Sequence, residues 1–239
     1  MATNKKGAAK APTFKCRFCD KEYKREDTVL THACVKRDRY NDRESRLMRE
    51  AYRLYMLFME AHKFQMKKNE EPLMQFIKSR YFNDFYDFAQ YILSHDILNK
   101  EQFIKHVLTG GKTVYEWKSH KTYEEWVISC IRNEHPRRGI ERSINAIVEW
   151  GVATDNEWTD FFDNISTERA ILWFETGKLS PWIIYAASPE SGNKLLNRFS
   201  DSELEYLVRF IDPTYFKILQ IRYNDEVMDI RNLLTEAGI

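Results

Sequence analysis

Residues 14–34 carry the sequence FKCRFCDKEYKREDTVLTHAC, which holds three of the four cysteines of the chain. Cys16 and Cys19 are separated by two residues, and His32 follows after a further twelve. Zinc takes four sulfur or nitrogen ligands in a tetrahedron, and two cysteines at this spacing bind one ion from a single turn. Such a cluster is typical of a metal site in a reducing compartment rather than of a disulfide framework. The fourth cysteine, Cys130, lies outside the cluster. We therefore predict one structural zinc ion at this stretch.

The fourth ligand is less regular than the first three. The nearest candidate is Cys34, which lies only two residues after His32. Positions two apart on a regular helix face different directions, so the backbone must change its winding around residues 32–34 before both side chains reach one ion. Two alternatives stay open, a three-ligand site completed by water and a contribution from the distant His62. The predicted ligands are Cys16, Cys19, His32 and Cys34.

The segment over residues 12–37 resembles the ββα zinc finger that binds its ion through two cysteines and two histidines, here as a variant in which a cysteine takes the place of the second histidine. The resemblance is carried by the ligand spacing and by three core positions, Phe14, Tyr23 and Val29, placed around the ligands as in that family. It implies two short strands followed by a helix. The departure is at the fourth ligand, which the family places three to five residues after the first histidine.

The same resemblance implies a DNA-binding surface. In the family, four helix positions face DNA bases, and here they fall on Arg25, Asp27, Thr28 and Thr31. Arg25 would pair with a guanine edge, and Asp27 would support that arginine. Basic side chains on and after the finger would contact phosphates. These expected phosphate contacts are Lys15, Arg17, Lys21, Lys24, Lys36, Arg37 and Arg39.

The charge of the chain is unevenly divided. Residues 1–49 contain 14 Lys and Arg against 7 Asp and Glu, a net charge of +7, whereas residues 50–239 contain 23 against 29, a net charge of −6. A basic front of this kind favours contact with a polyanion, DNA or by the same contacts RNA. We expect residues 1–11 to be a flexible basic arm that adds to this contact.

Residues 38–239 are predicted to form an all-helical domain. A hydrophobic share of 43% supports a sizeable core, while six Pro and eight Gly are too few for the tight turns of a β-sandwich or barrel. Apolar residues recur at three- and four-residue spacing after residue 41, which predicts a long linking helix over about 41–67. The helical body then covers about 73–239.

Start and stop signals of short helices support the all-helical body. Capping boxes are expected at Asn99 with Gln102, Thr122 with Glu125, Thr154 with Glu157, and Ser200 with Glu203. Three prolines stand where a helix would begin, namely Pro181, Pro189 and Pro213. Four glycines stand where a helix would end, namely Gly110, Gly151, Gly177 and Gly238.

The sequence shows no catalytic constellation, because no glycine-rich phosphate loop, nucleophile elbow or His-Glu-x-x-His motif is present. We therefore expect a protein that is not an enzyme. The aromatic cluster over residues 81–91 is interpreted as core rather than as a platform for bases. No apolar run approaches the roughly 18 residues of a membrane span, and residues 1–12 lack a signal-peptide pattern. A cytoplasmic location without membrane contact is the expectation.

A second resemblance covers most of the chain. The segments 124–126, 177–185 and 211–213, together with the finger, are similar to a family carried by T-even-like tailed phages and their cyanobacterial-virus relatives. This resemblance implies a viral origin and a place in the host-cell cytoplasm, and it implies nothing about activity.

Three hypotheses follow from the sequence. The first is a DNA-binding accessory protein of replication, recombination or transcription, in which the finger holds DNA and the acidic helical body docks a protein partner. The second is an adaptor or structural protein, in which zinc folds a protein-contact module. The third is a nucleic-acid enzyme that uses carboxylates of the body, such as Asp84 and Asp87, to hold a divalent metal.

Overall fold

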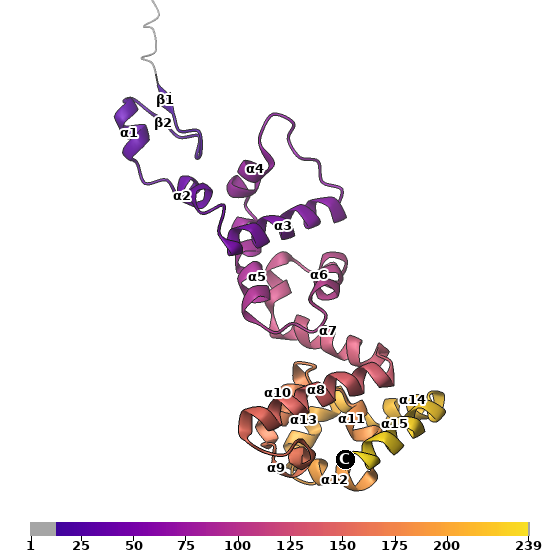
Figure 1. The fold of residues 1–239 in the computed structure, drawn as a ribbon. Coiled ribbons are helices and arrows are strands. Elements are labelled where there is room, and N and C mark those ends of the chain that lie inside the picture. The colour runs from indigo at the N-terminus through magenta and orange to yellow at the C-terminus, as the bar shows by residue number, and fades with distance from the viewer. Residues whose placement is uncertain (1–12, 239) are drawn as a thin grey trace, which may run out of the picture. The chain divides into compact units, whose positions relative to one another are not determined.

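The computed structural model describes residues 13–238, so the predicted basic arm over residues 1–11 lies outside the described part of the chain. The prediction of a mainly α fold with a small ββα unit at its start is confirmed (Figure 1). Within residues 13–238, none of the helices has the length and apolar character needed to cross a membrane. The elements are β1 (Phe14–Lys15), β2 (Glu22–Tyr23), α1 (Glu26–Thr31), α2 (Val35–Asn41), α3 (Arg46–Ala61), α4 (Pro72–Lys78), α5 (Phe82–Ser94), α6 (Lys100–Thr109), η1 (Val114–Lys118), α7 (His120–Asn133), α8 (Pro136–Thr154), η2 (Trp158–Asp160), α9 (Phe161–Asn164), α10 (Thr167–Glu175), α11 (Trp182–Tyr185), α12 (Pro189–Leu196), α13 (Asp201–Ile211), α14 (Pro213–Arg222) and α15 (Asn224–Glu236).

The described chain separates into two compact units. Unit 1 runs from the finger to Asp96 and also contains Val107–Lys118, while unit 2 consists of Ile97–His106 and the chain from Ser119 onward. The predicted domain boundary between residues 37 and 38 lies inside unit 1. There α2, which begins within the predicted finger segment and extends beyond it, packs against α4.

The predicted linking helix over about 41–67 is wrong in its bounds. A turn separates α2 from α3, and it ends at Ser45, whose Oγ accepts a backbone hydrogen bond in the first turn of α3. After α3 the chain turns at Lys63, where φ is +54°, and the N–H of Phe64 bonds to the carbonyl of Met59. Neither break contains Gly or Pro, so the apolar periodicity alone suggested one continuous helix.

The core of unit 1 is aromatic. Phe58 on α3 contacts Phe85 on α5 with ring centroids 5.4 Å apart, and Phe85 contacts Trp117 on η1 at 5.9 Å. Phe82 and Phe88 are buried as well, so interpreting the 81–91 cluster as core is confirmed. Burial of large rings in edge-to-face contact stabilises the packing of α3 against α5.

Unit 2 has a core that surrounds Trp182, whose side chain is fully buried. Beside it, Ser180 donates to the Glu134 carboxylate at 2.5 Å, and the backbone N–H of Ser180 donates to Ser143 at 2.8 Å. Arg142 also pairs with Glu134, at 2.7 Å. These contacts tie α8 to the chain before α11, while Nε of Arg142 and Nε1 of Trp182 are buried without a hydrogen-bond partner.

The helix signals were correct in part. Ser200 and Glu203 form the predicted capping box at α13, and Pro189 and Pro213 open α12 and α14 behind capping Ser188 and Asp212. The box predicted at Thr122 is wrong, because α7 begins at His120 and Ser119 caps it. The box predicted at Thr154 is wrong as well, and Gly151 lies within α8 rather than after its end.

Candidate metal centre

Cys16 and Cys19 lie in the tight turn that joins β1 to β2. The turn is closed by two backbone hydrogen bonds of 2.9 Å, from Cys16 N–H to the carbonyl of Lys21 and from Asp20 N–H to the carbonyl of Cys16. Asp20 has a φ of +60°, a conformation that aspartate tolerates better than most residues. This backbone turns both thiols toward the same point.

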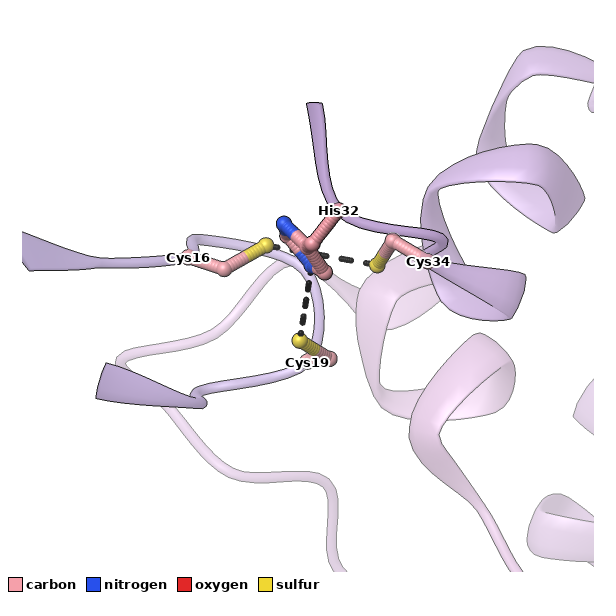
Figure 2. Close-up of side chains that lie close together, drawn as sticks. All are labelled: Cys16, Cys19, His32 and Cys34. Atoms are coloured by element: carbon pink, nitrogen blue, oxygen red, sulfur yellow. Dashed lines mark hydrogen bonds between the residues drawn. The ribbon is translucent and has the colours of Figure 1, made fainter. Parts of the chain in front are cut away.

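His32 and Cys34 reach that point because the helix between them is broken. α1 ends at Thr31, and His32 is extended, with ψ of 145°. Cys34 is extended too and is the N-cap of α2. The change of winding that the two-residue spacing required is thus a complete break between two helices, and Figure 2 shows the four side chains converging from these three segments.

The four ligand atoms lie within 4.8 Å of one another. Cys16 Sγ is 4.0 Å from Cys34 Sγ, and Cys19 Sγ is 3.4 Å from His32 Nε2. A zinc–sulfur bond of about 2.3 Å gives a tetrahedron with edges of about 3.8 Å, so these separations fit one ion. In residues 13–238 no other set of three or more His, Cys, Asp or Glu side chains forms such a group, and His62 is not part of this one.

The surroundings of the ligands favour metal binding. His32 Nδ1 lies 2.7 Å from the carbonyl of Val29, a contact that leaves Nε2 to face the ion. Burial opposes ionisation of Cys16, but hydrogen bonds from the backbone N–H groups of Cys19 and Phe18 outweigh it and lower the pKa of Cys16 to about 7. For Cys34, burial dominates and raises the pKa of the thiol above its usual value.

A small core supports the metal centre, and one of its members was not predicted. Phe18 is buried, with 8% of its surface exposed, whereas the predicted core residue Phe14 is 36% exposed. The reason is that the finger packs on neighbouring helices, and Phe18 lies on the side that meets them, 5.4 Å from the ring of Tyr40. The side chains that pack against Cys16, Phe18 and Cys34 are Cys19, Tyr23, Val29, Tyr40 and Met74.

An ion pair fastens the finger to α4. Lys78 at the end of α4 contacts Asp20 at 2.8 Å and Glu70 at 2.9 Å. Burial lowers the pKa of Lys78, but its bonds to the two carboxylates outweigh this and raise the pKa overall. The sequence carries no signal for this contact, because Asp20 and Lys78 are far apart along the chain.

The residues expected to face DNA bases all lie on the surface of the finger. Arg25, Asp27, Thr28 and Thr31 are exposed. Arg25 donates to both oxygens of the Asp27 carboxylate, from Nε at 3.1 Å and from Nη2. The expected support of Arg25 by Asp27 is therefore present in the structure. Lys21 and Lys24 are exposed beside it.

Other expected phosphate contacts are engaged within the protein. Arg37 donates to the carbonyls of Leu30 and His32, at 2.7 and 3.0 Å, and so closes the end of α1. Arg39 lies 3.7 Å above the ring of Phe82 and donates to the carbonyl of Ile77. Lys15 pairs with Asp20, Arg17 lies over Phe18, and Lys36 is half-buried on α2.

Three cysteines and one histidine form a group that is compatible with a zinc site, with two short strands and a helix around them. No protein-family model, curated protein or solved structure matches the chain. The resemblance to phage proteins therefore has no support from these comparisons, and the viral origin stays a prediction.

Proposed function

We propose that this chain is a non-enzymatic DNA-binding accessory protein whose finger is folded by one structural zinc ion. The observation that carries the proposal is the exposed Arg25–Asp27 pair at the start of α1, on the same small module as the four candidate metal ligands. The helical units would position the finger and offer surfaces to a protein partner of replication, recombination or transcription.

Zinc is the ion that suits the ligands best. Three thiolates and one imidazole form a soft, four-coordinate set, which is the arrangement of structural zinc sites. With all four positions filled by protein atoms there is no open place for a substrate or a water nucleophile. The ion therefore acts on the fold of the finger.

The Arg25–Asp27 pair is suited to a guanine edge. A guanidinium carries five N–H groups, and the contact with Asp27 uses the Nε side of the fork. The Nη1 and outer Nη2 hydrogens remain, and two parallel donors match the O6 and N7 acceptors of guanine. Because Asp27 fixes the plane of the guanidinium, less side-chain entropy is lost when DNA binds.

The test is fluorescence anisotropy with the full zinc-loaded chain and labelled duplex and single-stranded DNA at two salt concentrations. Affinity should fall steeply with salt and on chelation of zinc. Arg25→Ala should weaken binding and relax base preference, and Lys21→Ala should weaken binding equally on all sequences. Lys217→Ala, which removes an equally exposed lysine from α14, is the matched control. Absence of binding at low salt would overturn the proposal.

A second candidate function is a zinc-folded module that contacts protein. The observation in its favour is that two large apolar side chains stand out from the finger and the start of α2, Leu30 with 70% and Val35 with 64% of the residue surface exposed. Large exposed apolar patches are characteristic of protein interfaces, and these two side chains are candidates to contribute to one. If the anisotropy test finds no DNA binding, this function becomes the stronger candidate.

A further inference from the structure

The loop between α3 and α4, residues 62–71, is held in a defined conformation by a side chain of α4. The side-chain amide of Gln75 on α4 accepts from the N–H of Lys67 at 2.8 Å and donates to the carbonyls of Lys67 and Glu70, at 2.9 and 2.7 Å. At its other end, the turn at Lys63 closes α3. A loop fixed at both ends loses little entropy when it binds a ligand.

This loop presents an aromatic ring to solvent. Phe64 is 51% exposed although it touches Phe58, with ring centroids 5.7 Å apart. His62 stacks on Phe64, at 5.6 Å and an interplanar angle of 17°. Phe64 thus contacts two other rings and still has 51% of its surface exposed, so part of the ring is accessible to a further planar group.

Most of the charged side chains that the loop exposes to solvent are positive. Lys63, Lys67 and Lys68 are exposed. Of the two carboxylates, Glu70 pairs with Lys78 at 2.9 Å and more loosely with Lys67 at 3.8 Å. This leaves Glu71 as the one exposed acidic group of the loop. The loop thus combines a half-exposed aromatic ring with three exposed lysines, and this combination complements a polyanion that carries planar groups.

The loop is also linked to the finger through Lys78. Lys78 contacts Glu70 of the loop and Asp20 of the finger at the same time. These two ion pairs place Glu70 of the loop close to Asp20 of the finger, within one unit. A duplex keeps its bases stacked on one another, so a side-chain ring at the surface can stack only on a base that is unpaired.

We propose that loop 62–71 binds an unpaired stretch of DNA, with a base stacked on Phe64 and the backbone held by Lys67 and Lys68. This inference rests on the proposed DNA-binding function and adds single-strand preference to it. The finger holds phosphates, and the loop selects DNA whose bases are accessible.

The experiment measures the affinity of the full zinc-loaded chain for oligothymidylate and for duplex DNA by fluorescence anisotropy. Phe64→Leu keeps an apolar contact with Phe58 but removes the stacking ring, and it should lower the affinity for oligothymidylate about tenfold while leaving duplex affinity unchanged. Phe64→Trp should restore binding. Lys68→Ala should reduce the slope of log affinity against log salt by about 0.7 on the single strand. Tyr115→Leu removes a ring that is 69% exposed elsewhere in the same unit, and it is the matched control.

The outcomes separate this inference from the proposed function. If Phe64→Leu binds oligothymidylate as tightly as the unchanged chain does, or if Tyr115→Leu loses as much affinity, the loop is not the binding surface. Duplex binding that still depends on Arg25 would then leave the proposed function standing. Failure to bind either kind of DNA would overturn both.

Discussion

Arg39 is one of the residues expected to contact DNA, and in the structure its side chain also joins the helices of unit 1. Its guanidinium stacks on Phe82 at 3.7 Å, Nη1 donates to the carbonyl of Ile77 at 3.2 Å, and Nη2 donates to Asn83 at 2.9 Å. These contacts join α2 to α4 and to α5. Arg39→Ala removes all three.

The cost can be estimated from the contacts. The half-buried hydrogen bond to the carbonyl contributes about 1 kcal/mol and the exposed one to Asn83 about 0.5 kcal/mol. The stacking on Phe82 adds about 0.5–1 kcal/mol. We therefore expect Arg39→Ala to destabilise unit 1 by about 2 kcal/mol, and Arg39→Lys by about half of that, since lysine keeps the charge but not the planar fork.

The assay is amide hydrogen exchange followed in α4, which reports the opening of unit 1 without interference from unit 2. Lys36→Ala on the same helix is the control, and it should change stability by no more than about 0.5 kcal/mol. Anisotropy with DNA is measured in parallel, at a temperature where each variant is folded. If Arg39→Ala leaves exchange in α4 unchanged but lowers DNA affinity more than Lys36→Ala does, the structural role assigned to Arg39 is refuted.

Three further predictions concern the metal centre and unit 2. Cys16→Ser should abolish stoichiometric zinc binding in mass spectrometry and speed hydrogen exchange over residues 13–38, while unit 2 keeps its helical circular dichroism; a global loss of helix would contradict this. In the zinc-loaded protein no thiol should react fast with iodoacetamide. After chelation the finger opens, so its three thiols should react at neutral pH. Cys130 should stay slow because burial raises its pKa to about 11, and its reaction should speed up only as pH rises toward that value. Gly177→Ala should lower unit 2 stability by about 2 kcal/mol in thermal melts, since φ is +74° there and a Cβ would lie 2.6 Å from Leu98; an unchanged melting temperature would contradict the assigned turn.

The candidate metal centre could be predicted because its four ligand residues lie close together along the sequence, at a spacing that zinc sites use. The spacing of Cys16, Cys19 and His32 limits the backbone to a turn followed by a helix, and the structure has both. The break before Cys34 was required by the two-residue spacing, but its form was not, since a distorted helix and a broken one satisfy the same spacing.

Packing partners distant along the chain could not be predicted. Phe14 and Phe18 are both aromatic neighbours of the first cysteines, and what decides which of them is buried is the position of α2 and α4. Arg39 looked like one more basic residue in a basic segment, because its partners Ile77, Phe82 and Asn83 are about forty residues away.

Helix caps are also only partly predictable from a local sequence pattern. Ser200 and Thr122 precede a glutamate at the same spacing, yet only Ser200 begins a helix. A threonine three residues before a glutamate also fits inside a helix that another residue, here Ser119, has already started. The pattern locates a cap only when no better one lies just upstream.

Cys34 is both one of the four candidate metal ligands and the N-cap of α2, so no linker lies between the candidate metal site and that helix. Zinc fingers strung on flexible linkers reorient independently of one another. Here a rotation of the finger would be transmitted directly to α2 and, through Tyr40 and Met74, to the packing of α4. A zinc ion bound at this site would join the finger directly to α2, and inserting flexible residues between Cys34 and Val35 would uncouple the orientation of the finger from that of the helices.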